Sequence, residues 1–316
     1  MKQLIVLFLC ISSIVTAQEY GTVDVKVRKY PKYTSAQRLA TKIKSDFNND
    51  GDKIRAVFIW LTANIRYDLQ EYNNPSNRKI GFKYRTEAER QIKLQQIKDQ
   101  IVNETFKNRK SVCEGYAQSF KKVCDLLDIE AVVVTGYARN SSQEIGVIPR
   151  NSNHAWNAVK MGLKWQLVDA TWAAGHEENN KWKQFFSNYY FYPNPTDLIR
   201  SHLPEQNAWQ LLQNPVSKKA YANQPMIGQG FLNKNLRLMS PKTGIITKKG
   251  TIVFNIKNLK PSHSISYVFK NQQYGKRATV QFSNKTGRFP IDVQNKRNTE
   301  LYIFINNEVA LEYKIK

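Results

Sequence analysis

The stretch SVCEGYAQSF, residues 111–120, gives the first indication of this chain's chemistry, because it places a cysteine at the start of a helix. Ser111 and Glu114 have the spacing of a capping box, in which both side chains satisfy free amides of the first turn. This pattern predicts that Cys113 is the second residue of the helix. Free amides and the helix dipole there favour a thiolate and lower the pKa of a cysteine. Cys113 is therefore a candidate nucleophile.

Apolar residues continue from Cys113 along one face of the expected helix. They recur every three or four residues, the period of a single helical face: Ala117, Phe120, Cys124 and Leu127. This stripe predicts a face packed on the core, in which Cys124 is a small buried apolar residue. A helix separates Cys113 from Cys124 by roughly 16 Å, too far for a disulfide, so both thiols are expected to be free.

A histidine and an aspartate lie in a segment that predicts a β hairpin, HAWNAVKMGLKWQLVDATW, residues 154–172. A turn at Met161-Gly162 would make His154 and Asp169 cross-strand neighbours about 5 Å apart. A carboxylate at that distance fixes the imidazole tautomer and favours the imidazolium, as a cysteine nucleophile requires of its base. The same pair is also compatible with a purely structural hydrogen bond.

The motifs VCEGYA, HAWNAV and WQLVDATW, in this order, resemble the transglutaminase-like superfamily, and in particular its secreted bacterial and kyphoscoliosis-peptidase-like branch. The resemblance extends to TGYA (135–138) and YYFYPNPTDLIRSHLPEQNAWQLL (189–212), and covers roughly residues 50–215. It implies an α+β fold: a papain-like core with the nucleophile helix packed on an antiparallel sheet.

By this resemblance Cys113 is the nucleophile, His154 is the general base and later acid, and Asp169 orients His154. Ser111 departs from the pattern, since family members commonly have glycine there, but the cysteine is untouched. The amide of Cys113 is a candidate oxyanion donor, because helix-start amides point where negative charge develops. The sequence does not identify a second donor.

Other residues near these motifs have two readings. Trp156, Trp172 and Tyr116 are candidates for a substrate groove or oxyanion site, and packing in the core explains them equally well. His176 and His202 have no cysteine or carboxylate at metal spacing, so we interpret both as non-ligands. We expect no metal and no cofactor.

The chain of 316 residues, 41% of them hydrophobic, is long enough for one large or two smaller domains. Residues 1–17 have the pattern of a cleaved signal peptide, with a buried strand or membrane anchor as the alternative. Residues 18–235 are expected to form the catalytic domain. Short β-type runs predict a small all-β sandwich, of the immunoglobulin-like class, over residues 236–316.

Several local elements are expected before the nucleophile. Residues 20–29 alternate like an edge strand, and residues 46–57 imitate a calcium loop whose last ligand is replaced by Val57, which favours an acidic helix start instead. Amphipathic helices are expected over 52–65, with Trp60 buried, and over 86–106, with these residues inward: Ile92, Ile97 and Ile101.

The formal net charge of +23 is spread over every segment, and no nucleic-acid motif accompanies it. We therefore expect no nucleic-acid partner, and a solvated basic surface that attracts anionic envelope polymers. The signal pattern predicts an exported protein, periplasmic or secreted, without a stable membrane span after cleavage.

The implied reaction is attack of the Cys113 thiolate on an amide of a peptide or protein, giving a thioester that water or an amine resolves. Water gives a peptidase or amidase, an amine gives cross-linking, and the resemblance favours hydrolysis. One alternative is a catalytically silent protein of this fold that binds or scaffolds partners in the cell envelope. Another is an envelope-binding protein that acts through its basic surface.

Overall fold

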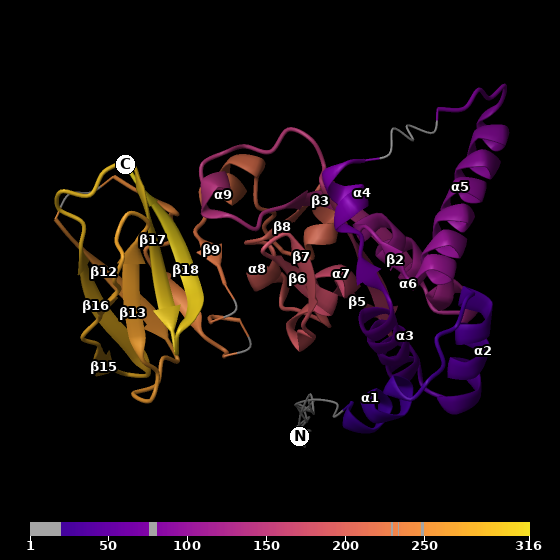
Figure 1. Cartoon of the computed structure of the whole chain (residues 1–316), viewed down its shortest axis with the longest axis horizontal. Coiled ribbons are helices and arrows are strands. Elements are labelled where there is room, and N and C mark those ends of the chain that lie inside the picture. The colour runs from indigo at the N-terminus through magenta and orange to yellow at the C-terminus, as the bar shows by residue number, and fades with distance from the viewer. Residues whose placement is uncertain (1–19, 76–80, 229, 233, 248–249) are drawn as a thin grey trace, which may run out of the picture.

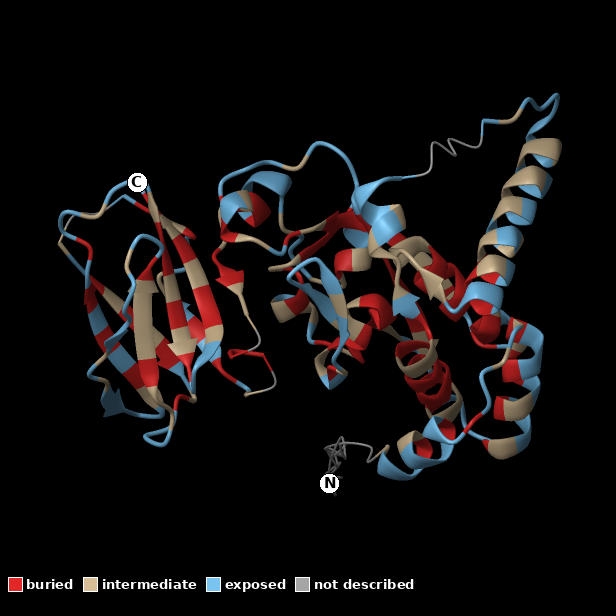
Figure 2. Cartoon of the chain, in the orientation of Figure 1, coloured by how far each residue is buried: buried red, intermediate tan, exposed pale blue. Residues whose placement is uncertain are grey.

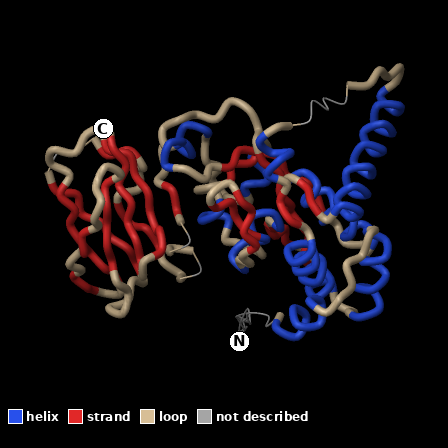
Figure 3. The backbone as a smooth tube through the Cα atoms, in the orientation of Figure 1, coloured by secondary structure: helices blue, strands red, loops and turns tan. Residues whose placement is uncertain are grey.

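The computed structural model describes residues 20–75, 81–228, 230–232, 234–247 and 250–316. The expected signal peptide over residues 1–17 lies outside them. Helices gather on the N-terminal side of the molecule, strands on the C-terminal side, and a mixed region lies between (Figure 3). The predicted α+β class is confirmed. None of the helices in these ranges is long and apolar enough to cross a bilayer.

Helix α3 forms the centre of the helical part and is buried almost throughout (Figure 2). Its residues from Ile54 to Thr62 are all buried, and Trp60 stacks on Phe106 at a ring distance of 5.2 Å. The predicted helix over 52–65 is thus confirmed. The helices of this part are α1 (Gly21–Arg28), α2 (Ala36–Asp46), α3 (Asp50–Asn64), α4 (Leu69–Asn73), α5 (Glu87–Asn108) and α6 (Cys113–Leu126).

The predicted edge strand over residues 20–29 is wrong, because this segment forms helix α1. Val23 and Val27 are buried against α3, whereas Val25 is 59% exposed. The alternating valines fit a period of two, but the spacing of four between Val23 and Val27 also fits one helical face. Packing on α3 selects the helix. The predicted acidic helix start is confirmed, because Asp50 and Asp52 lie in the first turn of α3.

Helix α5 confirms the charged helix predicted over 86–106, but not all of its inward residues. Ile92 is 60% exposed, and the buried side chains lie near the C-terminal end: Val102, Thr105 and Phe106. Figure 1 shows the reason, since the N-terminal half of α5 projects away from the other elements. Only its C-terminal turns have a surface on which to bury apolar side chains.

A four-stranded antiparallel sheet supports the nucleophile helix, in the order β5-β4-β3-β8. Its strands are β3 (Ala131–Ala138), β4 (His154–Met161), β5 (Lys164–Val168) and β8 (His202–Pro204). Helix α6 packs on β3 and β4 with the predicted stripe inward, including the fully buried Phe120 and Cys124. Asn157 joins the two layers, because its amide nitrogen donates to Ala117 O at 3.0 Å and Val132 O at 3.1 Å.

Shorter elements complete this region. The two-residue strands β1 (Arg66–Tyr67) and β2 (Lys110–Ser111) pair in parallel beside the start of α6. After the sheet follow α7 (Ala170–Ala174), the hairpin β6 (Gly175–Glu178) and β7 (Lys181–Gln184), then α8 (Pro195–Leu198) and α9 (Lys218–Ala222). Single 3-10 turns lie at Ser142–Glu144, Asn188–Tyr190 and Asn207–Gln210.

The C-terminal part is a sandwich of two sheets (Figure 1). One contains β10 (Arg237–Ser240), β12 (Thr251–Lys257), β16 (Thr286–Asp292) and β15 (Gln281–Ser283); the other contains β11 (Ile245–Ile246), β18 (Glu308–Ile315), β17 (Thr299–Ile305), β13 (Ile265–Phe269) and β14 (Lys276–Arg277). We letter the seven main strands A to G in chain order: β10, β12, β13, β15, β16, β17 and β18. The first sheet then has the order A-B-E-D, and the second contains C, F and G. This is the order of an immunoglobulin-like sandwich.

The segment between the two parts already belongs to the sandwich by its hydrogen bonds. Strand β9 (Met226–Ile227) pairs with β18, ahead of the predicted boundary at residue 236. The other side of the junction is held by Arg139, whose guanidinium donates to Arg200 O at 2.7 Å and Ala222 O at 3.1 Å. The boundary itself stays a prediction.

We predict that Asn157→Ala lowers the free energy of unfolding by about 2 kcal/mol, because it removes one hydrogen bond from the sheet to α6 and a second one from β4 to β3. Urea unfolding followed by circular dichroism measures the change. Asn103→Ala on the exposed face of α5 is the matched control, with an expected change near zero. Equal stability of Asn157→Ala and wild type would remove Asn157 from this role.

Candidate active site

Cys113 is partly exposed at the first residue of α6, not the second, because the predicted capping box does not form. The N-cap is Val112, which provides no side-chain cap. The backbone of Ser111 pairs with Tyr67 in the β1-β2 ladder, and its carbonyl accepts the Asp68 amide at 3.0 Å. Strand pairing therefore holds Ser111 outside the helix, while the helix-start position of Cys113 remains.

Gly115 allows the start of α6 to lie close to its neighbours. A Cβ atom at this position would lie 1.9 Å from Ser111 Oγ and 2.5 Å from Thr105 Oγ1. A larger residue would push the helix away from β2 and α5. The glycine thus allows close packing on the side chains of Ser111 and Thr105.

The β4-β5 hairpin forms, but in a different register from the predicted one. Ala158 pairs with Leu167, and the two-residue turn is Gly162–Leu163, one residue later than expected. Gly162 has a φ of +59°, which tight hairpin turns require at this position. Consequently Asp169 lies beyond the end of β5 and is not the cross-strand partner of His154.

Asp169 nevertheless reaches His154 from the start of helix α7. As the N-cap of α7, its Oδ1 accepts the amide of Trp172 at 2.9 Å. Its Oδ2 lies 2.7 Å from His154 Nε2, and both side chains are buried. The other imidazole nitrogen, Nδ1, remains for Cys113, which interacts with His154. The structure thus brings Cys113, His154 and Asp169 together.

A second histidine, interpreted above as a non-ligand, contacts the same carboxylate. His202 is 1% exposed, and its Nε2 lies 3.0 Å from Asp169 Oδ2. Strand β8 places it there, because His202 pairs with Ala138 just as His154 pairs with Gly136 on the other side of β3. A carboxylate therefore does lie at ligand distance from His202, contrary to our expectation.

His154, Asp169 and His202 form the one group of possible metal ligands among the described residues. The separations of 2.7 and 3.0 Å between the nitrogens and Asp169 Oδ2 are hydrogen-bond distances, and both bonds use the same oxygen. Direct hydrogen bonds account for the whole arrangement without a metal.

The protonation states of this group follow from burial and mutual contacts. Burial alone would lower the pKa of His154, but Asp169 and then Cys113 outweigh it and raise that pKa to about 10. Burial alone would raise the pKa of Asp169, but His154 and His202 hold it below its usual range. Burial lowers the pKa of His202, and Asp169 offsets this only in part. At neutral pH, His154 is a cation, Asp169 an anion and His202 neutral.

A cleft of about 560 Å³ opens beside His154. Trp172 lines it, in agreement with its role as a groove candidate, and its ring lies 5.7 Å from that of His154. Trp156 and Tyr116 are 1% exposed, so neither forms a groove wall. Trp156 lies under the imidazole of His154, and the Tyr116 hydroxyl donates to Ile65 O at 2.5 Å. Packing in the core, the second of the two readings, therefore accounts for both residues.

Tyr67 is a cleft residue that the sequence analysis missed. It lies on β1 and packs against Trp182 of the β6-β7 hairpin at a ring distance of 5.6 Å. Burial, and then the nearby Cys113, raises the pKa of Tyr67 far above its usual range, so its hydroxyl remains a proton donor. Only the pairing of β1 with β2 brings Tyr67 near the nucleophile, which explains why no motif indicated it.

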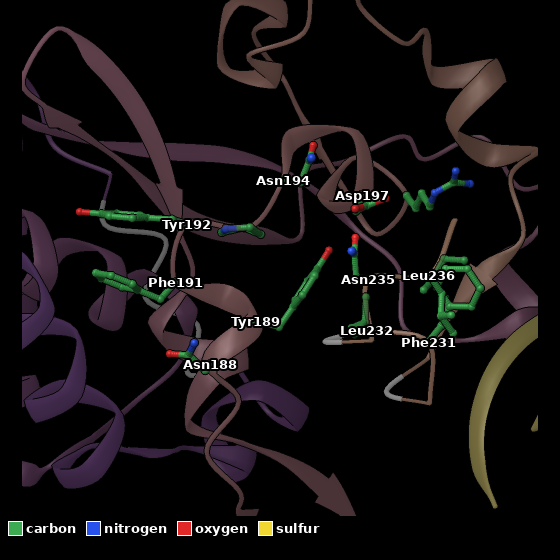
Figure 4. Close-up of a pocket in the computed structure, with 13 residues that line it drawn as sticks. Asn188, Tyr189, Phe191, Tyr192, Asn194, Asp197, Phe231, Leu232, Asn235 and Leu236 are labelled. Atoms are coloured by element: carbon green, nitrogen blue, oxygen red, sulfur yellow. The ribbon is translucent and has the colours of Figure 1, made fainter. Parts of the chain in front are cut away.

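A second hollow lies at the junction of the two parts, away from this chemistry (Figure 4). Tyr189 and Asp197 form one side, and Phe231, Leu232 and Leu236 form the other. None of its described lining residues is a cysteine or histidine. His176, also interpreted as a non-ligand, lines the main cleft on β6.

Comparison with known proteins indicates the same superfamily as the sequence motifs. Residues 37–170 match the sequence model of the transglutaminase-like superfamily. Human kyphoscoliosis peptidase is 24% identical over 310 residues, which are 95% of this chain and 43% of that protein. Drosophila melanogaster hillarin is 26% identical over 147 residues, 42% of this chain and 18% of hillarin. The chain therefore spans less than half the length of these relatives.

Among solved structures, a crystal structure of a TGase covers 57% of this chain and 38% of its own, with 18% identity and a TM-score of 0.30. At this TM-score, the superposition adds nothing to the assignment, which rests on the sequence matches. Residues 37–170 therefore form a transglutaminase-like domain, which confirms the resemblance predicted from the motifs.

Proposed function

We propose that the protein is a cysteine-dependent acyl-transfer enzyme that acts on amide bonds of peptides or proteins. One observation carries the proposal: His154 lines an open cleft, is held by the buried Asp169, and interacts with Cys113 at a helix start. A nucleophile, a base and an orienting carboxylate in this order meet the requirements of cysteine catalysis.

The chemistry begins with the Cys113 thiolate paired with the His154 imidazolium. The sulfur attacks the amide carbonyl carbon, and the Cys113 amide at the helix start stabilises the negative oxygen. When the tetrahedral intermediate collapses, the carbon–nitrogen bond breaks and His154 gives its proton to the leaving amine. The product is a thioester on Cys113, with His154 now neutral.

The second half returns the enzyme to its first state. His154 takes a proton from water, which attacks the thioester, and the acid product leaves as the thiolate and imidazolium are restored. We propose water over an amine as the acceptor, because the human relative is named a peptidase. An amine at the same step would give a cross-link.

The proposed substrates are peptides or proteins of the envelope or the extracellular space. The signal pattern over residues 1–17 supports this location, and the charge of +23 supports contact with anionic polymers there. Mass analysis of the protein recovered from the periplasmic fraction and from the culture medium tests the location, and a chain beginning at Gln18 in either fraction is the expected result.

We predict that iodoacetamide alkylates Cys113 rapidly at neutral pH and that His154→Ala slows this reaction at least tenfold, because the imidazolium stabilises the thiolate. The pKa of about 10 for His154 means that the pair persists through neutrality and is lost as the pH rises towards that value. Mass spectrometry of the native protein across pH 4 to 9 gives the rates.

Cys124 is the internal control for this experiment, since it is fully buried and burial raises the pKa of its thiol. It should remain unlabelled until the protein unfolds. If Cys113 reacts at the same rate in wild type and in His154→Ala, the two residues do not form a catalytic pair and the proposal fails.

A peptide library should be cleaved by wild type and not by Cys113→Ala, whose fold should stay intact because Cys113 is partly exposed. Dansylcadaverine, included as a competing amine, distinguishes the two acceptors by mass spectrometry. Cleaved peptides without the dansyl group are expected. Dansylated products without cleavage would reassign the enzyme to amine transfer.

Asp169→Asn should lower kcat by about a hundredfold with little effect on KM, because the neutral amide stabilises the imidazolium less well. Steady-state kinetics on a peptide identified in the library separates the two parameters. A wild-type kcat in this variant would remove Asp169 from the mechanism.

A further inference from the structure

We propose that His202 is a positioning residue, which keeps the Asp169 carboxylate ionised and directed at His154 by donating a neutral hydrogen bond to Asp169 Oδ2. The inference rests on the proposed function, since it assigns His202 to the same reaction. His202 does not line the cleft, and it acts on His154 through Asp169 and through direct ring packing, since the two imidazoles meet edge to face at a centroid distance of 5.3 Å.

The arrangement of hydrogen bonds fixes the tautomer of His202. Nε2 faces the carboxylate at 3.0 Å and must therefore carry the hydrogen. In a neutral ring Nδ1 then accepts, and the Ser201 hydroxyl donates its one hydrogen to Nδ1 at 2.8 Å in preference to Leu198 O at 3.3 Å. A neutral ring with its hydrogen on Nε2 satisfies both contacts. A neutral donor stabilises the anion without competing with His154 for its charge.

The surroundings hold this ring in place. The His202 ring packs against Trp172 at 4.5 Å and Trp156 at 5.2 Å, both edge to face. Gly136 on β3 permits this packing, because a Cβ atom there would lie 2.3 Å from Leu203 O and 2.6 Å from the Trp156 ring. Gly136 thus permits the close pairing of β8 with β3, which brings His202 near Asp169.

The other titratable groups around Asp169 are phenols. The pKa values of Tyr67, Tyr116 and Tyr190 are all raised, first by burial, and Asp169 adds to each rise. These hydroxyls therefore stay neutral across the pH range of the alkylation experiment, pH 4 to 9. A change in the pH profile of Cys113 alkylation after substitution of His202 therefore reports on Asp169 and His154.

The test compares three substitutions of His202 by the iodoacetamide rate at Cys113 across pH 4 to 9. His202→Gln places an amide nitrogen close to the position of Nε2, whereas His202→Asn is one carbon shorter and His202→Phe has no donor. We expect Phe and Asn to lower the rate at pH 7 about tenfold, and to move the acid limb to higher pH. Gln should recover most of the wild-type rate and profile.

Equal rates and profiles in all three variants and wild type would overturn the inference. His154→Ala separates this failure from that of the proposed function. If His154→Ala slows alkylation and the His202 variants do not, the enzyme proposal stands and the role of His202 is wrong. If His154→Ala has no effect, the proposed function itself fails.

A measurement on the wild-type protein keeps the inference testable if the variants do not fold. Nitrogen-15 NMR of labelled histidine identifies the tautomer of each ring. We expect a neutral His202 with its hydrogen on Nε2 and a protonated His154 at pH 7. A protonated His202, the opposite tautomer, or one equivalent of bound metal in the purified protein would each overturn it.

Discussion

The buried negative charge of Asp169 is the constraint on which the site depends. A carboxylate taken out of water is costly unless hydrogen bonds and a counter-charge replace its hydration. Here the Trp172 amide, His154 and His202 supply three contacts from α7, β4 and β8. The charge thus requires these elements to meet, and their meeting places His154 between the carboxylate and Cys113.

The position of the nucleophile depends on a second set of contacts, those that hold α6. Asn157 ties the middle of the helix to the sheet, and the Tyr116 hydroxyl ties its first turn to the end of α3 at Ile65. Gly115 brings the same turn close to β2 and α5. Residues that flank the cysteine in sequence therefore serve its placement, while Tyr67 and Trp172 line the cleft.

The β sandwich also takes part in shaping the cleft. Glu312 on β18 lines the cleft, and its carboxylate accepts the amide of Ser142 at 3.2 Å. Arg139, which follows β3 directly, holds the chain that leads into β9. The C-terminal part is thus packed against the site by hydrogen bonds to loops that follow the sheet strands.

The sequence by itself determined the elements whose signal is local. The stripe after Cys113, the central helix over 52–65 and the short β-type runs of the C-terminal part each carry their own period, so they were predicted correctly. The residues of the Cys-His-Asp group were also named, from motifs in a fixed order. Where two periods fitted equally, as in the valines of α1, the local pattern was insufficient and packing on α3 decided.

Only the tertiary structure decided how the site is assembled. Asp169 reaches His154 from the start of α7 because the hairpin turns one residue later than predicted. The geometry of the turn sets the register of the two strands, and the alternation of side chains does not specify that geometry. Ser111 belongs to a strand ladder, so it forms no cap. His202 lies 33 positions after Asp169 in the chain, and only the pairing of β8 with β3 brings it to the carboxylate. Contacts of this kind are absent from sequence patterns, because they depend on which strands become neighbours.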